Sequence, residues 1–339
     1  MRTLRLAVLV FLCVTVAASA VAARRARAGS LDEGMALYRK ADFAGALKRF
    51  DDAAQQTGDK AARARAYQYA ALMHVALGKS HYALAARDIH SMVATDPQLR
   101  PDPEEFPEAY MRLYYQTASE NRGLAEPPKP GLTTLAIMDF DNNSVGEGAD
   151  KYAALGRGLS QMLITDLVEV PALRLVEREK INFVLDELKL QKSGHVDAAT
   201  AVRVGKVVGA QALLFGGAMV MDKDMKITWR LVKVETGEIL KAGETEGSAK
   251  KFFELEKKLA VALAQDLKVE VSDEALKKIE GSEQPNLDAA LAYSEGLKHL
   301  DEGHTQAAYQ KFEQASKLDP KFAAAKRRMT KIRPLTQAS

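Results

Sequence analysis

Hydrophobic positions divide the chain into three zones. From residue 30 to 122, apolar and small residues recur at helical spacing, as in GMALYRKADFAGALKRFDDAA. From 132 to 268, short apolar runs alternate with amphipathic helical stretches, and from 286 to 324 the helical spacing returns. The pattern therefore predicts an α/β domain with all-α segments on both sides of it.

The best strand candidate is the stretch TTLAIMDFDNN at residues 133–143. A continuous apolar run that ends in turn-forming residues is typical of a strand buried on both faces of a sheet. The same reasoning predicts further strands at 173–176, 212–221, 226–235 and 239–247, and helices at 152–170, 177–190, 197–208 and 249–267. The segment GLAEPPKPG at 123–131 holds three prolines, which cannot continue a helix, so we place a linker there.

An internal repeat relates the two helical zones. Gly34, Ala46, Phe50 and Ala53 have the same spacing as Gly296, Ala308, Phe312 and Ala315, and Pro320 follows where a unit of about 34 residues would end. Small residues where two helices cross, an aromatic between them and a closing proline resemble the tetratricopeptide-repeat family. A weaker middle copy falls at 66–98. The resemblance implies protein binding, and it implies that these hairpins pack on the central domain, on each other or on a partner.

The N-terminus has the pattern of an export signal. Arg2 and Arg5 precede an apolar run, and small residues at 18–22 offer cleavage sites, so residues 1–28 are interpreted as a signal peptide. The alternative is an uncleaved membrane anchor, because the apolar stretch approaches the minimum length of a span. We expect membrane contact to be peripheral unless that anchor is retained.

Charge and cysteine content narrow the function classes. The five arginines of residues 1–28 account for the positive formal charge of +3, so the mature chain is slightly acidic. We therefore expect no nucleic-acid partner. The single cysteine, Cys13, lies within the signal, so the mature chain can form no disulfide.

Four motifs of the central zone occur in the order and spacing of a known family. The four motifs are TLAIMDFDNNS, LRLVEREKINFVLDELKLQKSG, AVRVGKVVGAQALLFGGAM and LVKVETGEIL. They resemble the CsgG family, named for the curli secretion channel, and the related N-terminal domain of TolB. The resemblance covers residues 132–268 and implies a compact α/β domain with a mixed sheet, located in the periplasm or at the outer membrane. It also implies a tendency to form homo-oligomers. Its motif positions in this chain are Asp139, Phe140, Asn142, Glu177, Arg178, Gly205, Gly209, Gly216 and Gly237.

The chain departs from the channel member of that family. The channel builds its pore from two long hairpins, and a spanning strand needs about 9–11 residues. Here only residues 222–225 separate the predicted strands 212–221 and 226–235, and the strand 239–247 leads directly into a helix. We therefore expect a pore-less domain. The alternative is an outer-membrane-associated secretion channel subunit.

Clusters of reactive side chains provide no catalytic hypothesis. Gly156-Arg157-Gly158 lacks the third glycine of a phosphate loop, and no pair of histidines in the central domain has metal-ligand spacing. His299 and His304 lie at a helix and its turn, and we expect them to be solvated. The polar residues 139–143 fit turn chemistry or an assembly surface, and Glu177-Arg178 fits a structural ion pair or a subunit contact. We expect no catalytic, cofactor or metal residues.

These observations together predict an exported, non-enzymatic scaffold or adaptor of a bacterial envelope machine. Its expected location is the periplasm, with a possible association with the outer membrane. Secretion, surface polymer export and fibre assembly are the candidate contexts. Its expected partners are envelope proteins and further copies of itself.

Overall fold

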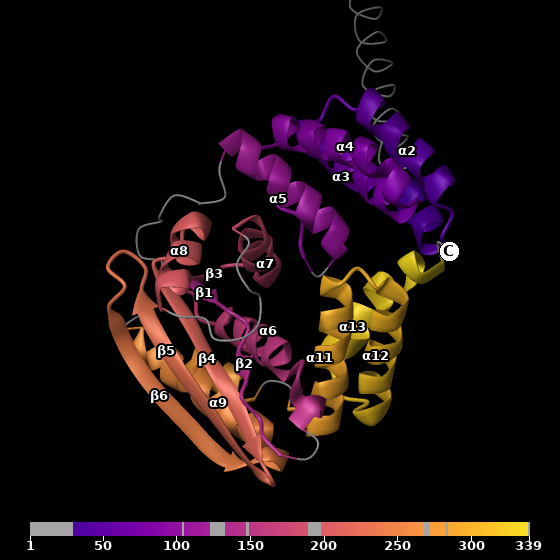
Figure 1. The fold of residues 1–339 in the computed structure, drawn as a ribbon. Helices are drawn as coiled ribbons and strands as arrows, with labels where there is room; N and C mark the ends of the chain where they lie inside the picture. The colour runs from indigo at the N-terminus through magenta and orange to yellow at the C-terminus, as the bar shows by residue number, and fades with distance from the viewer. Residues whose placement is uncertain are drawn as a thin grey trace, which may run out of the picture. The chain divides into compact units, whose positions relative to one another are not determined.

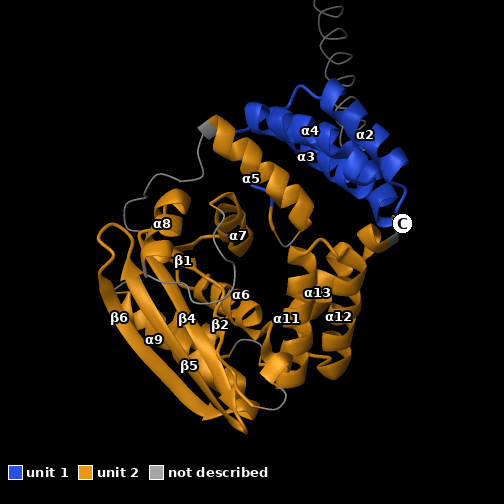
Figure 2. Ribbon diagram, in the orientation of Figure 1, with its two compact units in different colours: residues 1–101, 337–339 blue, residues 102–336 orange. Residues whose placement is uncertain are grey.

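The computed structural model describes residues 30–103, 105–122, 133–146, 149–188, 198–267, 271–281 and 284–337. They form two compact units that divide between Pro101 and Asp102 (Figure 2). The predicted signal peptide, 1–28, and the predicted linker, 123–131, lie outside the described residues. Within the described ranges, no helix combines the length and apolarity that crossing a bilayer requires.

The first unit is helical. Residues 30–39 form a helix, followed by α2 (Phe43–Gln56), α3 (Lys60–Ala76), the short η1 (Lys79–His81) and α4 (Tyr82–Thr95). Asp42 begins α2 by accepting a hydrogen bond from the backbone N–H of Gly45 at 2.9 Å, which satisfies one of the free donors of the first turn. The buried Phe50 ring lies against Gly34, where a Cβ would be only 2.5 Å from the ring. This contact lets the first two helices of the unit approach closely.

A mixed sheet organises the second unit (Figure 1). Its strand order is β3-β1-β4-β5-β6, with β2 also paired to β4. The strands β1, β3 and β4 are parallel, whereas β4, β5 and β6 form an antiparallel meander. The mixed α/β fold class that the sequence predicts is thus confirmed. The strand bounds are β1 (Thr133–Ile137), β2 (Asp141–Asn142), β3 (Leu173–Leu175), β4 (Ala212–Met221), β5 (Asp224–Lys233) and β6 (Ile239–Ser248).

Helices cover the two faces of this sheet. The helices α6 (Leu155–Leu167) and α9 (Phe252–Asp266) pack on the face formed by Leu135, Leu214 and Leu231, which are fully buried. The helices α7 (Arg178–Glu187) and α8 (Ala198–Val208) contact β1, β4 and β5, and Gly205 of α8 lies against Val234. By register, Leu213 and Val232 face α8. The alternation of buried side chains along β4 and β5 therefore supplies both faces of the core.

The predicted first strand differs from the observed one. We expected one strand within 133–143, ending in a polar turn with a loop from Asn142, but β1 ends at Ile137 and the short β2 follows at Asp141–Asn142. Between them the backbone N–H of Phe140 donates to the carbonyl of Gly156 at the start of α6. A Cβ on Gly156 would lie only 1.8 Å from the carbonyl oxygen of Phe140, so a glycine is needed where α6 approaches this segment.

The hairpin between β4 and β5 is tight. Met221 pairs with Asp224, so only Asp222 and Lys223 form the turn, and Asp222 adopts a positive φ of 57°. β6 leads directly into η3 (Ala249–Lys251) and α9. Throughout the described segment 198–267, the chain therefore follows the short connections that the sequence predicts. β6 is an edge strand, and Ile239 and Leu240 on it are exposed.

The C-terminal helices belong to the second unit. They are α10 (Asp273–Glu280), α11 (Leu287–Asp301), α12 (Thr305–Leu318), α13 (Ala323–Ile332) and η4 (Arg333–Gln337). The α11–α12 pair corresponds to the hairpin predicted at 286–324, and α11 packs against α6. The helix α5 (Glu108–Arg122), which we placed in the N-terminal segment 30–122, also lies in this unit. α5 packs on α7, which explains this grouping.

Candidate functional site

A buried charged cluster brings two of the family-motif residues together. Arg178, the first residue of α7, is almost fully buried. Its guanidinium donates to both carboxylate oxygens of Asp301, at 2.6 and 2.8 Å, and to Asp139 at 3.4 Å. Paired N–H groups facing one carboxylate form the strongest common type of ion pair in proteins. We refer to Asp139, Arg157, Arg178 and Asp301 as the charged cluster.

The local fold explains why these side chains meet. Asp139 follows β1 and Arg178 follows β3, and because β1 and β3 are parallel neighbours, both strands end at the same edge of the sheet. Asp301 is the last residue of α11. Arg157 on α6 donates to Asp301 at 3.2 Å, and Ser160 donates to Asp139 at 2.8 Å. The cluster thus joins the sheet, α6 and α7 to the C-terminal hairpin.

The electrostatics of the cluster keep the guanidinium of Arg178 positively charged. Burial lowers the pKa of Arg178, but Asp301 and Asp139 more than offset it, so the pKa lies above its ordinary value. Arg178 therefore remains charged and does not exchange protons with a substrate. This arrangement holds helices in place. Such a structural ion pair is one of the two roles that the sequence suggested for Glu177-Arg178, while Glu177 itself is exposed.

A second layer of charged groups surrounds this cluster. Arg328 of α13 lies 3.7 Å from Glu179 and donates to the carbonyl of Pro103 at 3.2 Å. Glu108 of α5 lies nearby, and its burial, followed by the charges of Asp301 and Glu179, raises its pKa to about 8. Glu108 is thus mostly protonated at neutral pH. The carboxylates outnumber the cations at this junction, and the protein accommodates the excess by protonating one of them.

A groove lies on the open part of the sheet. Its volume is about 620 Å³, and its lining residues are Asp141, Asn143, Phe215, Gly216, Gly217, Thr228, Trp229, Arg230, Ala242, Gly243 and Glu244. Gly217, Thr228 and Glu244 are register partners across β4, β5 and β6. Asn143 covers Gly217, where a Cβ would be 2.2 Å from the amide nitrogen. Gly216 and Gly217 contribute no side chains to the groove, and Arg230 and Glu244 place opposite charges at its walls.

The remaining family-motif residues shape backbone and packing. A Cβ on Gly216 would lie 2.1 Å from the carbonyl oxygen of Thr228 and 2.9 Å from the buried Phe140 ring. Gly209 and Gly237 both have a φ of 75°, which favours glycine, at the end of α8 and in the β5–β6 turn. The Asn142 side chain accepts a hydrogen bond from the backbone N–H of Ser144, which is ordinary turn chemistry.

The repeat positions form two matching helix crossings, one in each unit. Phe312 lies against Gly296, where a Cβ would be 2.5 Å away, as Phe50 lies against Gly34. The small residues of both copies are buried, namely Ala46, Ala53, Ala308 and Ala315, whereas Pro320 is exposed just after α12. The internal repeat therefore corresponds to a shared way of packing an aromatic ring on glycine.

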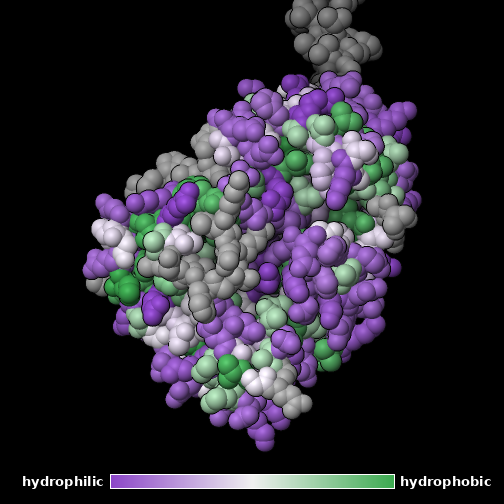
Figure 3. Space-filling view, viewed as in Figure 1, coloured by the Kyte–Doolittle hydropathy of each residue, from purple (hydrophilic) through white to green (hydrophobic). Residues whose placement is uncertain are grey.

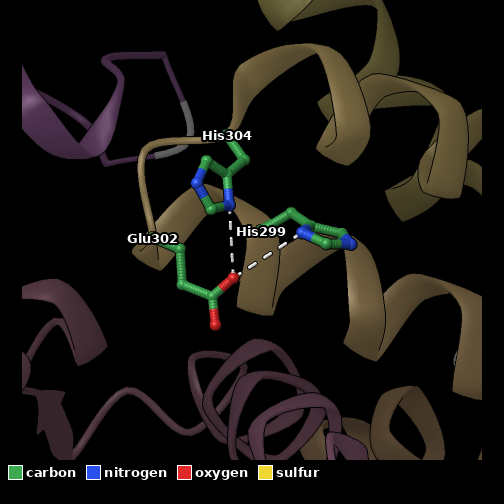
Figure 4. Close-up of side chains that lie close together, drawn as sticks. All are labelled: His299, Glu302 and His304. Atoms are coloured by element: carbon green, nitrogen blue, oxygen red, sulfur yellow. Dashed lines mark ion pairs between the residues drawn. The ribbon is translucent and has the colours of Figure 1, made fainter.

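One group of side chains was not anticipated as a site. We expected His299 and His304 to be solvated, but with Glu302 they place three ligand atoms within 4.8 Å of one another (Figure 4). The spacing of these residues matches no common metal motif, so the sequence pattern gave no signal. The glycine at position 303 is the one feature that could have indicated their proximity, because it allows a particular helix cap.

Comparisons with known proteins address the central domain. Residues 117–228 match the family model of the curli production assembly/transport component CsgG. This segment is therefore similar to a CsgG domain. The match begins within α5 and ends within β5, and so it is shorter than the 132–268 that the motifs suggested. The CsgG resemblance predicted from those motifs is confirmed.

Solved structures with a detectable likeness include two LpoB domains and TolB. The LpoB C-terminal domain from Salmonella enterica is 18% identical, with 41% of this chain and 95% of that chain covered and a TM-score of 0.28. TolB from Acinetobacter baumannii is 14% identical over 42% of this chain and 30% of that chain, also with a TM-score of 0.28. The LpoB C-terminal domain from Escherichia coli is 18% identical, over 40% and 95% of the two chains, again with a TM-score of 0.28. The curated proteins provide no match.

Proposed function

We propose that this protein is an exported, non-enzymatic scaffold of a bacterial envelope machine, which binds protein partners through its helical repeats and its CsgG domain. The observation that carries the proposal is the charged cluster, because it joins the CsgG domain to the C-terminal helical hairpin. A domain of an envelope assembly family and a repeat hairpin then act as one rigid body. Such a body suits the holding of other proteins in a defined geometry.

The groove on the sheet supports a binding role for the CsgG domain. It combines the glycines Gly216 and Gly217, which leave room above the sheet, with the charged side chains of Arg230 and Glu244. Extended peptide segments are recognised through backbone groups and through pockets for alternate side chains. We propose that the groove receives a segment of a partner protein.

The short β4–β5 turn favours a scaffold function rather than a channel function. The two residues Asp222 and Lys223 link strands of ten residues each. The pore hairpins attributed to the channel member of the family would need about 20 additional residues at this position. We propose that this chain has the assembly function of its family without conduction, and we expect no conductance when the mature chain is added to planar bilayers.

The proposed location rests on residues 1–28. Their basic start, apolar run and small-residue end are typical of a signal peptide, which supports export to the periplasm. Intact mass measurement of the protein extracted from the periplasm tests this directly. A mass that lacks the first residues is the expected result, and a full-length mass in the membrane fraction supports the anchor.

A crosslinking experiment tests the scaffold proposal. The mature chain is used as bait in formaldehyde-treated envelopes, and the recovered proteins are identified by mass spectrometry. Specific envelope partners or further copies of the chain are expected. An Arg230→Glu variant, which reverses a charge at the groove, should lose a partner that the groove binds. Lys206→Glu, an exposed change on α8, serves as the control. Recovery of neither partners nor self-association contradicts the proposal.

A further inference from the structure

The turn between α11 and α12 brings two imidazoles together through its backbone. Gly303 has a φ of 76°, its N–H donates to the carbonyl of Leu300 at 2.9 Å, and the N–H of His304 donates to the carbonyl of His299 at 2.8 Å. This pair of hydrogen bonds is the Schellman cap of a helix. In this cap, the side chains of the two residues joined by the bond that spans six residues are commonly in contact. Here those side chains are His299 and His304. Their separation is therefore set by the helix end rather than by side-chain flexibility alone.

Glu302 completes the arrangement. One of its carboxylate oxygens, Oε2, lies 3.7 Å from Nδ1 of His299 and 3.4 Å from Nδ1 of His304, as the dashed lines in Figure 4 show. The ring centroids of the two histidines are 6.1 Å apart, and their planes are inclined by 55°. Three potential ligand atoms from a segment of six residues thus converge on one point.

These distances suit a small transition-metal ion. Zinc binds imidazole nitrogen and carboxylate oxygen at about 2.0–2.2 Å in a tetrahedron, so its ligand atoms lie roughly 3.3 Å from one another. The two separations from Glu302 are within a few tenths of an ångström of this value. The third pair, between the two imidazoles, closes by rotation of the exposed His304 side chain. Two imidazoles and one carboxylate favour Zn²⁺, Ni²⁺ or Cu²⁺ over Ca²⁺ and Mg²⁺, which prefer oxygen ligands.

An unsatisfied nitrogen provides a second, independent observation. Nδ1 of His299 is shielded from solvent and has no hydrogen-bond partner among the described residues. Buried polar atoms in native proteins almost always have a partner, so an orphaned nitrogen calls for an explanation. A coordinated metal ion would satisfy it. His304 and Glu302 are exposed, and they leave a path by which the ion can enter.

We propose that His299, Glu302 and His304 form a binding site for a divalent transition-metal ion of the Zn²⁺ class. The three side chains occupy three positions of a tetrahedron, and water takes the fourth. The ion would hold the end of α11, whose last residue, Asp301, binds Arg178 in the charged cluster. Metal binding is thereby linked to the joint between the hairpin and the CsgG domain. The proposal does not depend on the function proposed above.

Isothermal titration calorimetry of the untagged mature chain tests this site. The protein is first treated with a chelator and then titrated with Zn²⁺, and with Mg²⁺ for comparison. We expect one Zn²⁺ to bind per chain with a Kd in the micromolar range or tighter, and no response to Mg²⁺. A wild-type chain that fails to bind Zn²⁺ at a concentration about 100-fold above the expected Kd overturns the proposal.

Three variants separate this site from adventitious binding. His304→Ala removes one exposed ligand and should weaken Zn²⁺ binding at least tenfold. Gly303→Ala keeps all three ligands but disfavours the positive φ of the cap, and it should weaken binding as well. His90→Ala removes an exposed histidine of the other unit and should leave binding unchanged. Equal affinities of the wild type and His304→Ala overturn the assignment.

Cobalt provides a readout of geometry. Co²⁺ bound by the wild type should show the intense visible absorption of a four-coordinate ion, and this absorption should be lost in His304→Ala. Circular dichroism at 222 nm checks that each variant keeps its helices. Unfolding of the variant is then excluded as the cause of a loss of metal binding. A weak six-coordinate spectrum in the wild type contradicts the tetrahedral site.

Discussion

Glu256 on α9 is fully buried beside two other charged residues. Its carboxylate lies 2.9 Å from Nζ of Lys257, which also pairs with Asp166 of α6. Burial, followed by the charge of Asp166, raises the pKa of Glu256 to about 8, in spite of Lys257. Two carboxylates, Glu256 and Asp166, share the single positive charge of Lys257. The excess carboxylate therefore holds a proton in the folded protein at neutral pH.

This shift predicts a pH dependence of stability. Between pH 4.5, the ordinary pKa of glutamate, and about 8, the folded state binds a proton at Glu256 that the unfolded state has lost. The free energy of unfolding therefore falls as the pH rises through this window, by up to about 1.4 kcal/mol per pH unit. Denaturant titrations at several pH values measure it through the fluorescence of Trp229, the one tryptophan of the chain.

Glu256→Gln isolates the contribution of this residue. Because glutamine does not titrate, the variant should show a shallower fall in stability between pH 5.5 and 8 than the wild type. Glu108, whose pKa also rises to about 8, accounts for part of the remaining slope. Identical slopes for the variant and the wild type would show that Glu256 ionises normally.

At the scale of elements, the charged cluster fastens helices to the sheet. Arg178 begins α7, Asp301 ends α11 and Asp139 follows β1, so a single guanidinium connects three elements that are distant in sequence. Gly158 of α6 contributes to the same joint, because it packs against Ser294 of α11. The close approach of α6 and α11 places Arg157 within reach of Asp301.

Removal of Arg178 should destabilise this joint strongly. In Arg178→Met, two aspartates stay buried with fewer positive partners, and the loss of one member of a buried ion pair costs about 3–5 kcal/mol. Arg203→Met is the matched control, because Arg203 is exposed on α8, and it should change stability by no more than about 0.5 kcal/mol. Urea denaturation followed by Trp229 fluorescence measures both. A loss below 1 kcal/mol for Arg178→Met would mean that the cluster contributes little.

The elements differ in how far their sequence predicts them. β4 has the bounds that its apolar run indicates, and the bounds predicted for β5 are shifted by two residues because the turn is tighter than expected. The helices α10 and α13 were missed. α10 is only eight residues long, and α13 carries four basic residues, AAAKRRMTKI, which weaken its apolar pattern.

The sequence did not predict the sites whose residues meet only in the folded chain. Asp139 was interpreted as part of a turn or an assembly surface, because its partner Asp301 lies in another zone of the chain and no local pattern connects the two. Glu302 and the two histidines are close in sequence, but their proximity depends on the positive φ of Gly303. Periodicity reports which face of an element is buried, and it carries no information about such contacts.

On the scale of the whole molecule, the chain folds as two compact units (Figure 2). The described residues of the second unit include two hydrophobic clusters, one between the sheet and α6 and α9, and the other between α11, α12 and α13. The visible side of α11 and α12 is mostly hydrophilic in Figure 3, which matches their packing by one face only. A unit with its own core and a polar surface has the properties of an independent domain.

A fragment of residues 102–336 should therefore fold alone. Its thermal midpoint, followed by Trp229 fluorescence, should lie within about 5 °C of the transition of the mature chain, a shift that corresponds to roughly 1–2 kcal/mol for a domain of this size. Fluorescence of an exposed tryptophan at 25 °C would contradict this expectation, because Trp229 is buried in the native unit. A fragment that starts at residue 132 and lacks α5 serves as the comparison and should be less stable.

The edge strand β6 has a consequence for the behaviour of concentrated protein. Long exposed edges recruit other strands, and β6 carries the exposed apolar residues Ile239 and Leu240 at its start. Further along, the strand carries the charged residues Lys241, Glu244 and Glu246, and the carboxylate of Glu244 lies 2.7 Å from Nζ of Lys226. These charged side chains oppose the stacking of many copies into fibrils, because like charges of neighbouring copies would then lie side by side. The chain is thus protected against amyloid-like growth over most of this edge, and its first two residues are where such growth would begin.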